Sequence, residues 1–133
     1  MPRKVRLTRI ISRAGEVAYQ LSNLQFSEFH PTPGWTPDIN AYRFDDRIEI
    51  WVDLAGVEKD EIRVEILPLS VRLSGERQTP VPACENCRQV LAMEIQNGRF
   101  ARQIQLSDPV DPERVTARHE NGLLHIQLPL ALG

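Results

Sequence analysis

The sequence has few of the features that define secreted scaffolds, membrane proteins or exported proteins. It contains two cysteines in 133 residues, too few for a disulfide framework. No apolar run approaches the ~20 residues that span a bilayer. No apolar stretch follows the basic start, so we expect no secretory signal, although an organellar transit peptide is an alternative for an Arg-rich start without acids. We expect a soluble, cytoplasmic protein.

The sequence also lacks the residue patterns of common catalytic sites. There is no GxxxxGK[ST] phosphate loop, no Ser-His-Asp order and no second cysteine pair to complete a four-ligand zinc site. We therefore expect no enzyme activity, no cofactor and no metal ion. Cys84-x-x-Cys87 is interpreted as free thiols in a loop, with metal bridging or a disulfide across a dimer as the open alternatives.

The charge distribution is uneven along the chain. The net charge of −2 gives no reason to expect nucleic acid as a partner, and 41% hydrophobic with 26% charged residues is ordinary for a globular protein. The first 13 residues, however, hold five of the 16 basic residues and none of the 18 acidic ones. A basic arm on an acidic body can attract a neighbouring copy of itself.

Residues 4–24 have the apolar spacing of an amphipathic helix, with steps of three and four. We predict a helical arm there, followed by a Pro-rich linker at residues 30–37. The arm either packs on its own domain or contacts partners and clients, and we favour contact. The predicted client-binding residues are Leu7, Ile10, Ile11, Val17, Leu21, Leu24, Phe26 and Phe29.

From residue 38 the period of the apolar pattern changes to two, which predicts strands. The expected strands are residues 48–54, 62–66, 71–75, 88–92 (weak), 100–106, 115–120 and 123–128. Short strands with turns every 8–12 residues are typical of a β-sandwich. Asn121-Gly122 predicts a two-residue hairpin turn that places Glu120 opposite Leu123 and Arg118 opposite His125. His119 and His125 then lie on opposite faces.

Four segments together resemble one known family. These are "VDLAGVEKDEIRVEI", "VRLSGER", "MEIQNGRFARQIQLS" and the closing "ARHENGLLHIQLP" with Ala117, Asn121, Gly122 and Leu124. In this order and spacing they are similar to the α-crystallin domain of the small heat-shock proteins. Ala55 and Ser107 stand where the family usually has proline, which puts little in doubt.

The resemblance implies an all-β, immunoglobulin-like antiparallel β-sandwich and an ATP-independent holdase that suppresses aggregation of unfolding proteins under stress. We expect an arm and linker at residues 1–36, the domain at 37–129 and a vestigial tail at 130–133. The partners are unfolding clients and further copies of the chain, with no membrane involved. An adaptor that binds one folded partner is the alternative, and an enzyme has no support.

The resemblance also implies a dimer of the non-animal type, in which a strand from the central loop enters the partner's sheet. Residues 88–92 are expected to pair near Ile39–Tyr42 of the partner. Arg102 is expected to form a salt bridge at or near that interface, and Trp51 with Leu123 could form a contact patch. The predicted interface residues are Ile39, Tyr42, Val90, Leu91 and Arg102.

In the family, a tail motif docks in a groove of a neighbouring dimer, here between residues 62–66 and 115–117. The groove residues are expected to be Val64, Ile66 and Val115. Leu130-Ala131-Leu132 has the motif's spacing but follows Pro129 directly, and chain gains only ~3.3–3.6 Å per residue. We therefore expect the tail not to link dimers, the groove to be empty or filled by another segment such as the arm, and assembly into dimers or small oligomers to depend on the arm.

Overall fold

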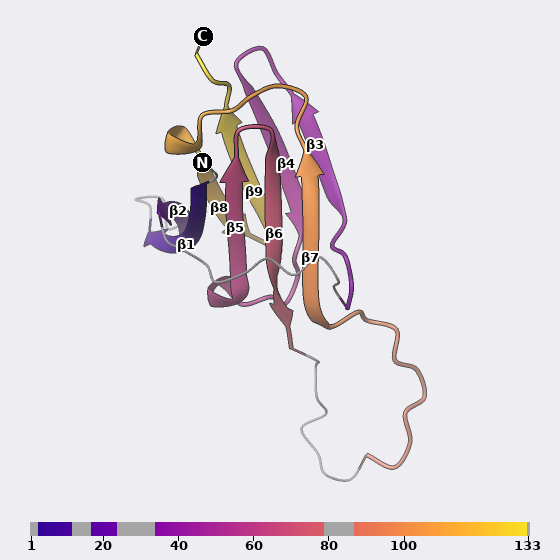
Figure 1. Cartoon of the computed structure of the whole chain (residues 1–133). Helices are drawn as coiled ribbons and strands as arrows, with labels where there is room; N and C mark the ends of the chain where they lie inside the picture. Colours follow the sequence, from indigo (N-terminus) through magenta and orange to yellow (C-terminus); the bar gives the residue numbers. More distant parts are fainter. Residues whose placement is uncertain (1–2, 12–16, 24–33, 79–86, 133) are drawn as a thin grey trace.

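The computed structural model describes residues 3–11, 17–23, 34–78 and 87–132. In these residues nine strands form an antiparallel sheet that folds over on itself into two layers (Figure 1). The strands are β1 (Arg3–Ile11), β2 (Val17–Asn23), β3 (Ile39–Arg43), β4 (Arg47–Asp53), β5 (Ile62–Leu67), β6 (Ser70–Arg77), β7 (Gly98–Gln105), β8 (Thr116–Glu120) and β9 (Leu123–Pro129). The expected all-β sandwich is thus confirmed.

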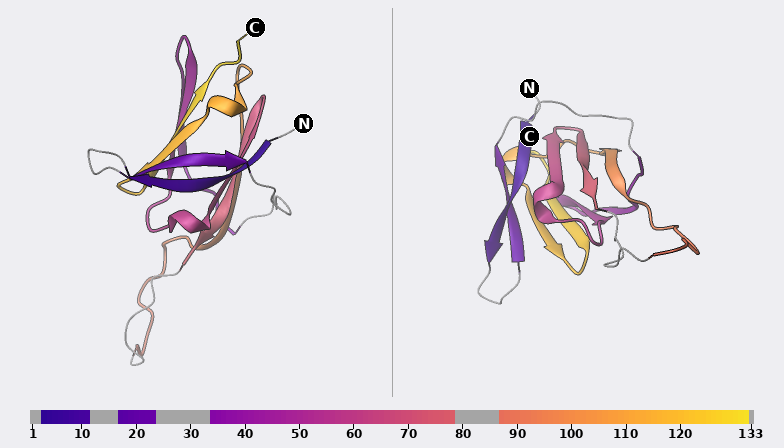
Figure 2. Two further views of the ribbon diagram at one scale, coloured as in Figure 1. Left: turned by 90° about the vertical axis from the view of Figure 1, so that its left-hand side faces the viewer. Right: turned by 90° about the horizontal axis from the view of Figure 1, so that it is seen from below.

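One layer holds β3, β4, β9 and β8, and the other holds β5, β6 and β7 (Figure 1). The β1–β2 hairpin lies between β8 and β5 in the strand order and closes one side of the sandwich (Figure 2). Two 3-10 turns, at Lys59–Glu61 and Pro112–Arg114, are the helices found in the described residues, and neither is long or apolar enough to cross a membrane.

The core lies between the two layers and consists of the inward residues of alternating strands. Ile50 and Val52 of β4 and Ile126 of β9 are fully buried on one side, and Val64 of β5 and Leu73 of β6 are fully buried on the other. Each strand places alternate residues on opposite faces, so the period of two seen in the sequence becomes one apolar and one solvated face.

The closing hairpin has the predicted register. Glu120 pairs with Leu123 and Arg118 with His125. The turn residues Asn121 and Gly122 have φ of 53° and 80°, the left-handed geometry that a type I′ turn requires. The carbonyl of Gly122 accepts from the amide of Leu54, which ties this turn to the end of β4.

Trp35 covers the outer edge of β7. The amides of Gly34 and Trp35 both donate to the carbonyl of Arg99, and the indole Nε1 donates to the carbonyl of Gly98 at 3.0 Å. The indole is 6% exposed and lies 5.2 Å from the Phe100 ring. This segment therefore satisfies part of an edge that would otherwise be open.

The predicted N-terminal helix is wrong for the residues that the structure describes. Residues 3–11 and 17–23 form two paired strands, with Ile11 opposite Val17 and Val5 opposite Asn23. The stretch 17–23 also alternates apolar and polar residues, which fits a strand as well as a helix. Tertiary context decides between them, because the edges of β5 and β8 offer backbone hydrogen bonds that a helix cannot make.

Candidate functional site

The strand β3 forms one end of the sheet and pairs only with β4 in the described part of the chain. Its residues are exposed except Ile39, which is half-buried against the core. An exposed edge strand presents unpaired backbone N–H and C=O groups to a further strand. The sequence predicted this strand, near Ile39–Tyr42, as the place where a partner subunit adds its own.

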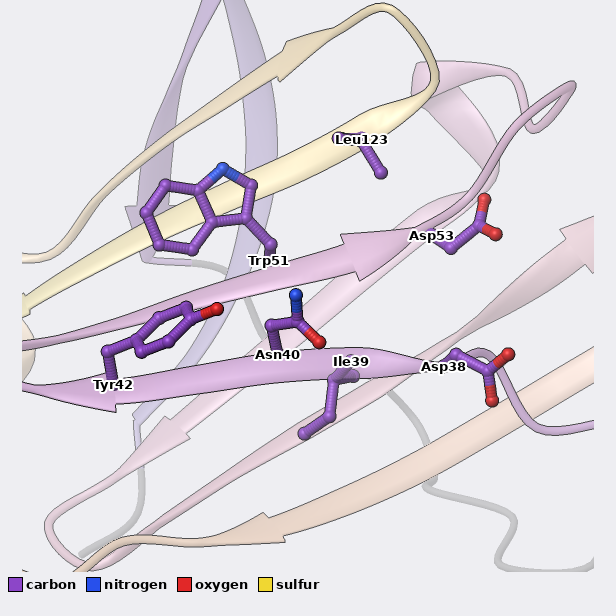
Figure 3. A pocket seen from close by; sticks show the side chains of 7 residues that line it. All are labelled: Asp38, Ile39, Asn40, Tyr42, Trp51, Asp53 and Leu123. Atoms are coloured by element: carbon purple, nitrogen blue, oxygen red, sulfur yellow. The ribbon is translucent and has the colours of Figure 1, made fainter.

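A cleft of about 380 Å³ lies on the outward face beside this edge (Figure 3). It combines an apolar floor with two carboxylates. Its lining residues are Asp38, Ile39, Asn40, Tyr42, Trp51, Asp53 and Leu123. Trp51 and Leu123, which the sequence analysis paired as a contact patch, line the same surface, and the contact patch stays a prediction.

A row of rings runs across this face from β3 to β9. The Tyr42 ring meets Trp51 edge-on at 5.7 Å, and Trp51 stacks on the imidazole of His125 with 3.9 Å between centroids and 11° between planes. Tyr42 is 50% exposed, so the outer end of the row remains accessible. Rings in such contact are held in fixed positions and give the cleft a rigid wall.

Glu49 joins His125, the last ring of this row, to Arg47 in a cluster of polar contacts. Nε2 of His125 lies 2.7 Å from Oε1 of Glu49, and Nε of Arg47 donates to Oε2 at 2.5 Å. An ionised carboxylate only accepts, so the His125 proton is on Nε2. Burial alone would raise the pKa of Glu49, but the hydrogen bonds from His125 and Arg47 outweigh it and hold the pKa below its usual value.

The segment that follows the central loop carries exposed apolar side chains. Val90 is 64% exposed, Leu91 89%, Met93 66% and Ile95 64%. The predicted strand at residues 88–92 is not formed in the single chain, where residues 87–97 are irregular. A strand needs a neighbour for its hydrogen bonds, and the neighbour predicted for this one belongs to another copy.

Arg102 lies on β7 and reaches toward the start of β3. Its Nη1 donates to the carbonyl of Pro37 at 2.9 Å, which connects the two layers at the edge where β3 begins. The predicted salt bridge to a partner is not tested by a single chain and stays a prediction.

The predicted groove residues belong to the buried core, and their role as a groove stays a prediction. Val64 and Ile66 are fully buried and Val115 is 7% exposed. Arg3–Arg6 of β1 pairs with β5, and Ala18–Gln20 of β2 pairs with β8. The sequence led us to expect this groove to be empty or to be filled by another segment such as the arm. In this structure strands β1 and β2 of the arm occupy its two edges.

A model of the Hsp20/alpha crystallin family matches residues 41–132. The chain belongs to this family. The match starts within β3 and ends just after β9, and it includes four of the seven cleft residues and the two strands that border the groove.

Curated relatives resemble the chain over part of their length. The 18 kDa antigen of Mycobacterium leprae is 30% identical over 93 residues, which are 70% of this chain and 60% of the relative. The 22.0 kDa heat shock protein of Arabidopsis thaliana is 41% identical over 81 residues, 60% of this chain and 40% of the relative. The chain thus spans about half the length of these two relatives.

Solved structures in the family have the same domain fold. Heat shock protein 16.0 from Schizosaccharomyces pombe aligns with a TM-score of 0.66 and 27% identity, over 73% of this chain and 88% of that one. The hspA protein of Xanthomonas axonopodis aligns with a TM-score of 0.63 and 25% identity, over 72% and 94%.

The residues after the last strand of the family domain contact their own chain. Leu130 forms a bridge with Val110, and its amide donates to the carbonyl of Asp46 at 3.0 Å. The amide of Ala131 donates to the carbonyl of Pro109. Leu130 is half-buried, whereas Leu132 is 89% exposed, so only one of the two apolar residues of the motif-like triplet is free to bind elsewhere.

Some predicted residues cannot be placed. Leu24, Phe26, Phe29 and Cys84 lie outside the described residues, and Cys87 is exposed. Among the described residues, no three His, Cys, Asp or Glu side chains are grouped so as to hold a metal ion. The Glu49–His125 pair was missed, since the register between β4 and β9 that joins them is not visible in either strand alone.

Proposed function

We propose that the protein is an ATP-independent holdase chaperone that binds unfolding proteins and suppresses their aggregation. Membership of the family supports this, and the observation that carries it is the exposed apolar surface of residues 90–95. Large apolar patches left open on a folded domain mark sites for other proteins. Their burial supplies ~25 cal/mol per Å² without any nucleotide.

We assign client binding first to the arm. The arm begins with a basic segment, and three of its apolar residues, Leu24, Phe26 and Phe29, follow β2 in the sequence. A segment that presents apolar residues ahead of a folded domain can bind many unrelated apolar sequences, because the hydrophobic effect has no directional requirement. The cleft on the sandwich is the second location for clients.

The protein acts as a dimer in this proposal. Residues 88–92 of one copy add a strand to the β3 edge of another, which pairs the exposed backbone of β3 and covers Val90 and Leu91. Arg88 then approaches the face that carries Asp38 and Asp53, so charge favours the same arrangement. Strand addition draws its affinity from backbone hydrogen bonds and its specificity from alternate side chains.

The test is light scattering of a heat-labile client with and without the protein, in the absence of ATP. We expect scattering to fall as the ratio of protein to client rises. The variant Leu24→Ser/Phe26→Ser/Phe29→Ser should lose most of the protection. The matched control Gln25→Ser/Ser27→Ala/Glu28→Gln changes the same segment and keeps its apolar residues, so it should protect as well as the parent.

One result would overturn the holdase function, and another would change the location of the client-binding site. No protection of any of several unrelated clients, together with tight binding of one folded protein, would make the chain an adaptor. Full protection by the triple-serine variant would move client binding from the arm to the sandwich.

A further inference from the structure

The central loop leaves the sandwich at one end of β6 and β7 (Figure 1). Arg77, the last residue of β6, pairs with Gly98, the first residue of β7, so the loop begins and ends at one place. Its described part, residues 87–97, includes the segment 88–92 that is expected to enter the partner's sheet. Contacts at the base of the loop therefore set the point from which the predicted dimer strand extends.

The side chain of Arg77 contacts three segments that are far apart in the sequence. Its Nε and Nη2 both donate to the carbonyl of Gln96, the Nε bond at 2.8 Å, near the far end of the loop. Its Nη1 donates at 3.1 Å to the carbonyl of Ala55, which follows β4. The guanidinium also lies 4.0 Å from the centre of the Trp35 ring. It makes both kinds of contact at once, because its N–H groups point along its plane and its face stays free to stack on an aromatic ring.

Trp35 connects this cluster to the linker. It lies in the described part of the linker, residues 34–37, which comes between β2 and β3 in the sequence. The indole Nε1 donates to the carbonyl of Gly98, and the ring contacts Phe100 as well as the guanidinium of Arg77. The segment that comes from the arm and the segment that contains the predicted dimer strand thus meet at one side chain.

The hydrogen bonds of Arg77 can open without exposing the core. The two carbonyls that it holds belong to exposed residues, Ala55 and Gln96, and Arg77 itself is half-buried. Hydrogen bonds at the surface exchange with bonds to water at little cost, so they open more often than the strand ladders of the core. The cluster therefore has two accessible states, one closed on Trp35 and one in which the carbonyl of Gln96 is released.

We propose that Arg77 is a positioning residue that couples the linker to the central loop. With Trp35 in place, its ring holds the guanidinium in the plane in which it binds Gln96. When Trp35 is displaced, Arg77 loses this support and the loop is released near its far end. Coupling between two sites is reciprocal, so release of the loop also loosens Trp35. The coupling within one chain is independent of chaperone activity, whereas its effect on the dimer rests on the proposed strand exchange at β3.

Hydrogen exchange of the full chain, diluted to the monomer, tests the effect of Arg77 on the linker. The amides of Gly34 and Trp35 both donate to the carbonyl of Arg99, so their exchange reports whether the linker is in place. Arg77→Lys keeps the charge but has no planar group that can stack on Trp35. We expect exchange at the two amides to be about fivefold faster or more, with unchanged exchange in β9 as evidence that the domain is folded. The matched control Arg63→Lys changes an exposed arginine on β5 and should alter neither.

A nitroxide label, also at monomer concentration, tests the effect of Trp35 on the loop. It is attached through Glu94→Cys, an exposed position in the described part of the loop, in a Cys84→Ser/Cys87→Ser background. Trp35→Leu should make the motion of the label about twofold faster or more, and the matched control Trp51→Leu should not. Trp35→Phe keeps a ring against the guanidinium and should give an intermediate mobility, which keeps the test decisive if Trp35→Leu unfolds the domain.

A double variant and the dimer complete the test. Arg77→Lys/Trp35→Leu should mobilise the label no more than the stronger single variant does, because both substitutions act through one contact. In sedimentation velocity, Arg77→Lys should raise the dimer dissociation constant by about threefold or more, since a loop that is less ordered before binding loses more freedom on binding. Arg63→Lys should leave the constant unchanged.

The coupling is overturned if the amides of Gly34 and Trp35 exchange in Arg77→Lys as they do in the parent. It is also overturned if the label is no more mobile in Trp35→Leu than in Trp51→Leu. A parent chain that forms no dimer would contradict the proposed strand exchange at β3, and the two monomer measurements would still decide the coupling.

Discussion

The imidazole of His125 lies between the carboxylate of Glu49, 2.7 Å away, and the indole of Trp51, on which it stacks. β4 and β9 bring the three residues together on the outward face of the sandwich, with Trp51 directly opposite His125 in the ladder. The side chains of His125 and Glu49 are 12% and 7% exposed, so this hydrogen-bonded pair is largely buried beside the wall of the cleft. The predictions below begin with this pair.

Removal of one partner of the pair should destabilise the domain. His125→Ala leaves a nearly buried carboxylate with one partner fewer, and we expect a loss of about 1–3 kcal/mol in the free energy of unfolding. Urea unfolding of the parent and the variant measures this loss. The control Glu120→Gln alters an exposed acid on the same hairpin and should stay within about 0.5 kcal/mol. Equal effects of the two substitutions would contradict a stabilising pair.

Acid should weaken the domain in two stages. Burial lowers the pKa of His119, with Glu58 opposing it, so the folded state prefers neutral His119 and loses stability as pH falls below the ordinary value of ~6.5. The pKa of Glu49 is lowered, so its contribution is present above ~4.3 and lost as pH falls through its folded pKa. Urea unfolding at pH 7.5, 5.5 and 3 should show both losses. His119→Gln should flatten the first and Glu49→Gln the second.

Gly75 should tolerate no side chain. A Cβ there would lie 1.9 Å from the carbonyl oxygen of Glu61 and 2.6 Å from the Phe100 ring, so Gly75→Ala should cost about 3 kcal/mol or more, or prevent folding. Gly98→Ala is the control, since its Cβ meets nothing within 4 Å and only the φ of 89° opposes it, at about 1–2 kcal/mol. Urea unfolding ranks the two, and a smaller loss at Gly75 would show that the strands separate there.

Leu91 should be needed for the dimer. Leu91→Asp places a charge in the strand expected to enter the partner's sheet, and we expect the dimer dissociation constant to rise at least tenfold. Leu132→Asp is the matched control, since both leucines are 89% exposed in the single chain. Sedimentation velocity over a range of concentrations measures both. Deletion of residues 78–92 should give monomers, and dimers that persist after it would count against strand exchange at β3.

The triplet Leu130-Ala131-Leu132 should not link dimers. Leu130 is paired with Val110 of its own chain, so Leu130→Ala/Leu132→Ala should lower stability by about 1–2 kcal/mol through lost burial at Leu130 and leave the assembly unchanged. Light scattering and urea unfolding of the same variant separate the two effects. Collapse of a large, uniform assembly to dimers in this variant would refute the prediction.

The sequence alone determined the sandwich and much of its register. The core residues of β4, β5 and β9 recur at every second position because one face of each strand is buried, although Trp51 and Leu123 place apolar side chains on the outer face. Asn121-Gly122 permits one turn geometry. The motif segments lie in the order and spacing of the family, and the family model matches them. Local patterns of this kind survive folding because burial and turn geometry act on neighbouring residues.

Only the tertiary structure decided the form of the arm and the pairing of Glu49 with His125. Residues 17–23 fit a helix or a strand by their pattern, and the open edges of β5 and β8 selected strands, because backbone groups over an apolar floor must be paired. Glu49 and His125 are 76 residues apart. Each looks like an ordinary surface residue in its own strand, and only the pairing of β4 with β9 brings them together, with Trp51 stacked on His125.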